Sequence, residues 1–198
     1  MNNKLKFKFS TQINIIGFIL VMMAGWIDTV GVNLFLTERS SFMSGRGAIL
    51  GYFAYKGNLK AFISILLVII SFIIGACMST KITKKTGLTG GLSLSGILII
   101  IASFCNNYNK ITMATILIPM AMGSQNAATS LTPINRTTHL TGPTTDIGIN
   151  IAERNWNTVI FWILRWIAFP LGAIIGLSLV HMVNNQIIHT STTLFLPA

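Results

Sequence analysis

The stretch Thr37-Glu-Arg-Ser-Ser-Phe-Met-Ser-Gly-Arg-Gly-Ala-Ile-Leu-Gly51 has a second version, Ile134-Asn-Arg-Thr-Thr-His-Leu-Thr-Gly-Pro-Thr-Thr-Asp-Ile-Gly148. An offset of 97 residues places Arg39 on Arg136 and aligns two glycines of the first stretch with glycines of the second. Both stretches are polar and glycine-containing, and both lie between very apolar segments. A repeat at about half the chain length predicts two copies of one membrane unit.

The composition indicates the environment of the chain. Of its 198 residues, 52% are hydrophobic and 9% are charged, whereas a soluble domain carries about 25% charged residues. This predicts an all-α, polytopic membrane protein. The net charge of +10 could suggest nucleic acid, but the basic residues are scattered singly or in threes between apolar runs. Membrane topology and contact with anionic lipid explain that pattern, so we expect a lipid bilayer as partner and no nucleic acid.

Two kinds of apolar segment follow one another along the chain. Two short, more polar segments, 42–55 and 141–153, reach only about 21 Å as helices. Each is a half-helix, a re-entrant element or a span completed by its neighbours. Five other runs are long enough, or nearly so, to cross the hydrocarbon: 12–36, 61–80, 87–105, 111–129 and 157–183.

Charge favours the re-entrant alternative. When the N-terminus lies on the cytoplasmic side of a bacterial inner membrane, the re-entrant alternative also places Lys81, Lys84 and Lys85 on the cytoplasmic side, as the positive-inside rule requires. Three crossings per unit then invert the second unit, giving one transmembrane domain of units about 12–108 and 109–198. The basic, apolar N-terminus imitates a secretory signal. Its repeat partner lies inside the protein, however, so we expect a retained first helix.

Polar residues inside the apolar runs are the first candidate site. Asp28 lies deep in the first run, and a carboxylate there must be solvated or paired. The offset of 97 pairs it with Gln125, which Asn126 follows. Asp28 is interpreted as a substrate or ion contact or a proton relay, and the alternative is a hydrogen bond that only holds two helices together.

The two hydroxyl-glycine motifs, Ser44-Gly45 and Thr141-Gly142, are the second candidate. Each hydroxyl can cap a helix, and each glycine permits close backbone approach. A half-helix N-terminus that faces a cavity suits an anion or a carboxylate. The alternative is that the glycines only allow helices to touch. The combined hypothesis is one central polar cavity lined by Asp28, Gln125, Asn126 and these motifs.

Arg165 lies inside the last long run, between two tryptophans. We expect it to pair with Asp146, and snorkelling to the inner interface is the alternative. Cys77 and Cys105 lie near the ends of consecutive antiparallel helices, so we expect free thiols. The three histidines are dispersed without metal-ligand spacing. With no phosphate-binding loop, nucleophile motif or paired catalytic carboxylates, we expect no enzyme, no cofactor and no metal.

Several stretches together resemble the YoaK-like family of small bacterial multi-pass membrane proteins. They cover nearly the whole chain in a fixed order: Gly25-Trp-Ile-Asp28 with Gly31, Ser41-Phe-Met-Ser-Gly45 with Leu50-Gly51, Ala121-Met-Gly-Ser-Gln-Asn-Ala127, and Leu140-Thr-Gly142. The chain departs from the family pattern at Arg46, at Leu140 and at Pro143. The resemblance implies a multi-pass membrane protein and no established activity.

These observations favour a transporter or channel-like protein for a small anionic or zwitterionic solute. Such a protein can use a coupling ion and can form a homo-oligomer. The alternative is a membrane scaffold, sensor or partner subunit that transports nothing. An intramembrane enzyme is a third class, disfavoured because no catalytic set is present. A polar cavity at Asp28 favours transport, and a dry, packed centre favours the scaffold.

Overall fold

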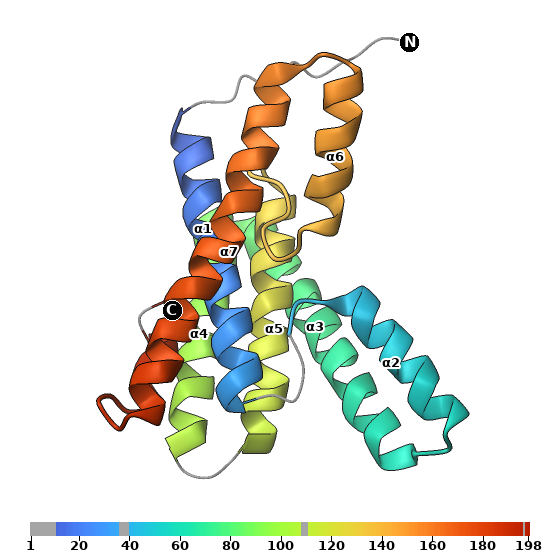
Figure 1. The fold of residues 1–198 in the computed structure, drawn as a ribbon, viewed down its shortest axis with the longest axis vertical. Helices are drawn as coiled ribbons and strands as arrows, with labels where there is room; N and C mark the ends of the chain where they lie inside the picture. The colour runs from blue at the N-terminus through green and yellow to red at the C-terminus, as the bar shows by residue number, and fades with distance from the viewer. Residues whose placement is uncertain (1–10, 36–39, 108–110, 196) are drawn as a thin grey trace.

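The computed structural model describes residues 11–35, 40–107, 111–195 and 197–198. The described residues are helical and contain no strand (Figure 1). The helices, in chain order, are α1 (Thr11–Val30), the π-helical turn η1 (Gly31–Phe35), α2 (Met43–Tyr55), α3 (Leu59–Thr86), α4 (Leu88–Asn107), α5 (Ile111–Ser130), α6 (Thr141–Ala152), α7 (Trp156–Asn184) and α8 (Thr192–Phe195). The expectation of an all-α protein is confirmed.

Four segments are long and apolar enough to cross a membrane: Thr11–Leu34, Leu59–Thr86, Leu88–Cys105 and Trp156–Asn184. They correspond to four of the five expected runs, and they make the chain an integral membrane protein. The remaining run, 111–129, forms α5 where expected but is not among these four. The reason is its composition, because α5 carries the polar residues Ser124, Gln125 and Thr129. All three are buried, and α5 packs against α3 and α4. A helix surrounded by protein can hold such groups without facing lipid.

The short segments are half-helices. α2 has 13 residues and α6 has 12, so at 1.5 Å per residue neither spans a hydrocarbon core of about 30 Å. Each begins near the middle of the molecule and runs outward beside the long helix that follows it, α3 or α7 (Figure 1). The two point to opposite ends of the molecule. Because each leaves by the end at which the preceding long helix finished, this is the geometry of a re-entrant segment.

Two tight helix crossings hold the centre together. α1 crosses α7, and α3 crosses α5. At each crossing a glycine leaves no room for a methyl group beside the partner's backbone carbonyl. The glycine and carbonyl pairs are Gly25 with Phe169, Gly172 with Met22, Gly75 with Met120 and Gly123 with Phe72. The likeness of the two crossings supports the prediction of an internal repeat, which remains a prediction.

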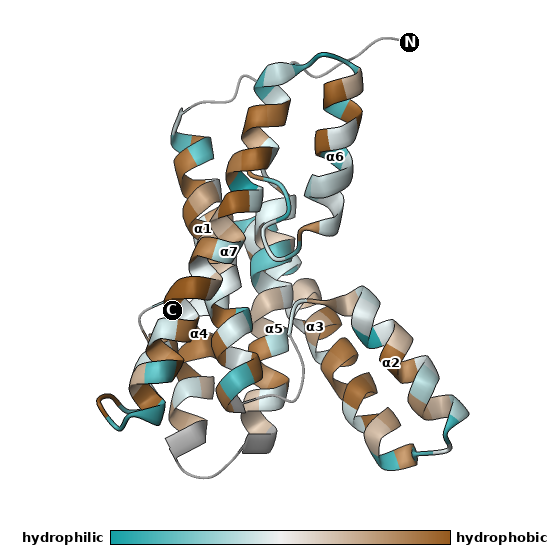
Figure 2. Ribbon diagram, in the orientation of Figure 1, coloured by the Kyte–Doolittle hydropathy of each residue, from teal (hydrophilic) through white to brown (hydrophobic). Residues whose placement is uncertain are grey.

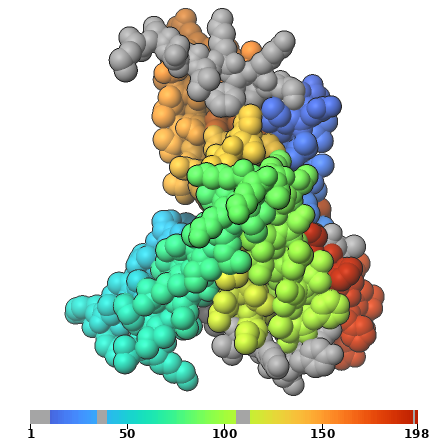
Figure 3. Space-filling model, turned by 180° about the vertical axis from the view of Figure 1, so that it is seen from behind, coloured from blue at the N-terminus to red at the C-terminus, as the bar shows by residue number. Residues whose placement is uncertain are grey.

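The outer surface is apolar. Figure 2 shows that α3 and α7 are rich in hydrophobic residues, and that the loop before α6 and the turn after it are hydrophilic. Large hydrophobic residues are exposed on both helices, among them Ile73 and Ile174. Seen from the other side in Figure 3, α2 and the first part of α3 project from the body of the bundle. Cys77 and Cys105 are free thiols, as expected.

The first prediction concerns topology. The long helices alternate in direction (Figure 1), so the basic end of α3 lies on the same side as the beginning of α1. Lys84→Cys, in a background without the two native thiols, should resist a membrane-impermeant reagent in intact cells. Lys56→Cys, between α2 and α3, should react as the matched control. Labelling of Lys84→Cys from outside would refute a cytoplasmic N-terminus.

The second prediction concerns the crossings. Gly172→Ala would place a methyl group against the backbone of Met22 and Trp26. Because neither neighbour is a flexible side-chain end, we expect a loss of about 1–3 kcal/mol of stability. Gly148→Ala in α6 is the control, since no atom lies within 4 Å of the added carbon. It should be neutral or slightly stabilising. Thermal unfolding in detergent measures the stability of both variants. Equal losses of stability in Gly172→Ala and Gly148→Ala would contradict the close contact between Gly172 and α1.

Candidate functional site

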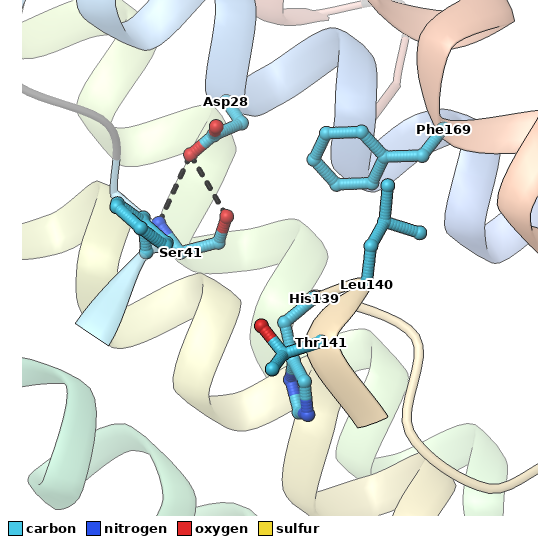
Figure 4. Close-up of a pocket in the computed structure, with 7 residues that line it drawn as sticks. Asp28, Ser41, His139, Leu140, Thr141 and Phe169 are labelled. Atoms are coloured by element: carbon cyan, nitrogen blue, oxygen red, sulfur yellow. Dashed lines mark hydrogen bonds between the residues drawn. The ribbon is translucent and has the colours of Figure 1, made fainter. Parts of the chain in front are cut away.

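A cavity of about 170 Å³ lies where the two interrupted segments meet (Figure 4). Four parts of the chain form it: α1, the residues just before α2, the residues around the start of α6, and α7. Its lining residues are Asp28, Ser41, Phe42, His139, Leu140, Thr141 and Phe169. One carboxylate and one imidazole therefore share the space with aromatic and aliphatic side chains.

Asp28 fastens the segment before α2 to α1. Its side chain is 1% exposed, and its Oδ1 accepts hydrogen bonds from the Ser40 hydroxyl at 3.1 Å and from the Ser41 hydroxyl at 3.0 Å. The Ser41 backbone N–H donates to the same oxygen at 2.9 Å, as Figure 4 shows. Hydrogen bonds to a charged acceptor are stronger than neutral ones. Asp28 thus both faces the cavity and holds the loop that forms one of its walls.

Gln125 holds the loop before α6, but it does not line the cavity. Its side-chain amide donates to the Leu20 carbonyl at 2.9 Å and to the Thr137 hydroxyl at 3.2 Å. The Thr137 hydroxyl also pairs with Thr129 at 3.1 Å. The amide oxygen of neighbouring Asn126 is buried without a hydrogen-bond partner among the described residues. Gln125 therefore joins α5 to the loop before α6 and to α1.

The expected cavity is assembled in part. Of its expected lining residues, Asp28 and Thr141 face it. Ser44 is exposed on α2, and neither it nor Gly142 is among the lining residues. Gly45 also lies outside the lining, but it leaves room for the Phe42 ring, which does face the cavity.

The expected capping of the short helices by Ser44 and Thr141 is not found. The N-cap residues of α2 and α6 are Phe42 and Leu140, and neither helix has a side-chain cap. The hydroxyl nearest to the start of α2, that of Ser41, is turned to Asp28 instead. Both short helices therefore begin at the cavity with backbone N–H groups that no capping side chain accepts.

Arg165 does not form the expected pair with Asp146 among the contacts of the described residues. Its side chain is 1% exposed, and its Nη1 and Nη2 donate to the carbonyls of Phe161 and Ile134, each at 3.2 Å. The guanidinium lies over the Phe161 ring, 3.4 Å from the centroid. The first acceptor lies on α7 itself and the second in the loop before α6, and the guanidinium also lies against Gly17 of α1.

Several site residues were not anticipated. Ser40, Ser41 and Thr137 hold the loops, and His139 and Phe169 face the cavity. The repeat contains a signal for the hydroxyls, because it places Ser40 on Thr137. Nothing in the sequence marks Phe169 as a lining residue. Among the described residues, no group of three or more His, Cys, Asp or Glu side chains could hold a metal.

His139 is held in its neutral form. Burial lowers its pKa below the ordinary value of 6.5, and the positive charge of Arg136 lowers it further. A neutral imidazole can donate one hydrogen bond and accept another. At neutral pH the cavity wall opposite Asp28 therefore offers a neutral hydrogen-bonding group.

Comparison with known proteins gives one result. A family described as "Protein of unknown function (DUF1275)" matches residues 16–197. No curated protein and no solved structure matches the chain.

The lowered pKa of His139 leads to a prediction about acid stability. The folded protein binds this proton less readily than the unfolded chain, so stability should fall as pH drops below about 6.5. In His139→Gln that part of the loss should disappear. Thermal unfolding between pH 7.5 and 5 measures it, with His189→Gln as a control outside the cavity. An unchanged pH dependence in His139→Gln would show that burial of this imidazole does not matter to stability.

Proposed function

Because the chain belongs to the DUF1275 family of proteins of unknown function, we propose its function from its own site. It is a transporter or channel-like protein of the bacterial inner membrane, with a cytoplasmic N-terminus, and it takes a small zwitterionic or anionic solute into the cavity at Asp28. Asp28 contributes either the contact for the solute's positive group or the site of a coupling proton or cation.

One observation carries the proposal: a buried carboxylate lies in a cavity where two half-helices begin. Many secondary transporters place their substrate and ion sites where interrupted helices meet near the middle of the bilayer. Backbone without regular hydrogen bonding is expensive in a membrane and is tolerated where it lines a cavity or is buried in protein. A scaffold needs neither interruption.

The chemistry of the walls favours a solute with two kinds of group. Asp28 suits an ammonium group, a proton or a small cation. The beginning of α6, at Thr141, lacks a side-chain cap. Its backbone N–H groups and the positive end of the helix dipole suit a carboxylate or another anion. A zwitterion satisfies both walls at once.

Size limits the solute further. The cavity measures about 170 Å³, close to the engineered cavity of about 150 Å³ that binds benzene. A solute of about six non-hydrogen atoms fits without rearrangement. Phe42, Leu140 and Phe169 form the apolar part of the lining, so a short aliphatic portion is favoured over a sugar.

The alternative is a scaffold, sensor or partner subunit, alone or as a homo-oligomer. The observation in its favour is that Asp28 Oδ1 already accepts three hydrogen bonds from the protein. A carboxylate with three such hydrogen bonds can have a purely structural role, in which it holds the loop and binds neither solute nor ion. Transport measurements separate the two functions.

The test is counterflow of small labelled solutes, including short amino acids and their anionic analogues, into proteoliposomes. Asp28→Asn keeps the shape of the side chain and removes its charge, so transport or its pH dependence should be lost while the protein still inserts and elutes as a folded species. Asp146→Asn is the matched control, since that carboxylate lies on α6 outside the cavity. Absence of counterflow for the whole panel, or full activity in Asp28→Asn, would favour the scaffold.

A further inference from the structure

The second wall of the cavity depends on how the loop before α6 is held. Residues 131–140 lead from α5 to α6 and bring His139 and Leu140 to the cavity. Side chains of other elements hold this loop. Thr137 is held from α5 by Gln125, and the carbonyl of Ile134 is held from α7 by Arg165.

The loop turns sharply where Arg165 holds it. Asn135, directly after Ile134, has a φ of 67°, in the left-handed region that asparagine tolerates better than most residues. Its side-chain oxygen accepts a hydrogen bond from the Arg136 N–H at 2.8 Å. Ile134 itself is 3% exposed. A buried carbonyl at a sharp turn needs a donor from elsewhere in the protein, and Nη2 of Arg165 supplies it.

Arg165 is itself fixed on several sides. Its Nη1 donates to the Phe161 carbonyl one turn earlier, and its guanidinium stacks over the Phe161 ring. On the α1 side it lies so close to Gly17 that a methyl group there would overlap it. The side chain is thus packed between α7 and α1 and bonded to the loop, although its Nε is buried without a hydrogen-bond partner among the described residues.

The first loop is held by the corresponding kind of contact with the opposite charge. There, the buried carboxylate of Asp28 on α1 accepts the backbone N–H of Ser41. Here, a buried guanidinium on α7 donates to the backbone carbonyl of Ile134. In each case one charged side chain of a long helix forms a hydrogen bond with a backbone group of an interrupted segment. Hydrogen bonds with one charged partner are stronger than hydrogen bonds between neutral groups.

We propose that Arg165 is the positioning residue for the second cavity wall: it holds Ile134 and thereby sets where His139 and Leu140 stand. Arg165 does not touch the solute. Its effect on solute selection rests on the proposed function, whereas its effect on the loop does not.

The test compares the second cavity wall with the protein core. Leu140 is the N-cap residue of α6 and lines the cavity, whereas Ala102 of α4 is 0% exposed. In a background with Cys77→Ser and Cys105→Ser, Leu140→Cys reports on the second loop and Ala102→Cys reports on general opening of the protein. The rate of reaction with a water-soluble thiol reagent is measured on purified protein, each variant against its own reporter background.

Arg165→Gln should raise the labelling rate of Leu140→Cys by about tenfold or more, because the charged hold on the loop is lost. The rate of Ala102→Cys should stay within about twofold. Asp28→Asn, which removes a contact of the other loop, should leave both rates within about twofold. Arg165→Lys keeps the charge but loses the two-pronged donor, so its effect on Leu140→Cys should be intermediate.

A general loss of stability would raise both rates together, and that result, or no change at Leu140→Cys, overturns the proposal. If Arg165→Gln fails to fold, Gly17→Ala decides the question, because it displaces the guanidinium without removing the charge. An asymmetric change in labelling with no counterflow of any solute would leave the positioning role standing and remove the transport function. For a solute that is transported, Arg165→Lys should raise KM more than it lowers the maximal rate.

Discussion

The backbone of an interrupted segment inside a membrane protein must find hydrogen-bond partners, because lipid offers none. The rest of this structure depends on how that requirement is met. At the first interruption the carboxylate of Asp28 accepts the Ser41 N–H, and at the second the guanidinium of Arg165 donates to the Ile134 carbonyl. Each charge is expensive to bury, and each is stabilised by the backbone group it serves. The hydrogen bond between them lowers both the cost of burying the charge and the cost of interrupting the helix.

The helix crossings make these contacts reachable. Gly172 of α7 lies against α1, and Gly75 of α3 lies against α5. At the crossing of α1 with α7, the guanidinium of Arg165 lies against Gly17 of α1 and donates from there to the carbonyl of Ile134 in the loop before α6. Small residues at such crossings are the usual means of helix association in lipid, where no hydrophobic force draws helices together. The packing of the helices therefore determines which backbone groups the charged side chains can contact. Those contacts in turn determine the paths of the loops.

The sequence predicted the framework well and the cavity only in part. The apolar runs, the short polar segments and the buried carboxylate Asp28 were all visible, because length and hydropathy are local properties. The partners of the polar residues were not, because they depend on the loop paths. Ser41, rather than Ser44, faces the cavity, and Arg165 was assigned to Asp146 on charge alone. Its actual acceptors are backbone carbonyls, which every residue possesses and no pattern distinguishes. α5 fell short of an apolar span because of its polar residues, and the packing shows only where these residues are buried.

Asp28 has two tasks in the proposed function, and they compete. The oxygen that holds the loop accepts three hydrogen bonds, and the same carboxylate lines the cavity. A proton or cation that binds there weakens the carboxylate as an acceptor for Ser40 and Ser41. The loop before α2 then loses its strongest hold, while the loop before α6, held by Arg165, does not. A ligand shifts a conformational equilibrium only by binding its states differently. Occupancy of Asp28 meets this condition, because it acts on one wall of the cavity and leaves the other in place. In the proposed function, filling of the ion site at Asp28 would thus change the shape of the solute site beside it.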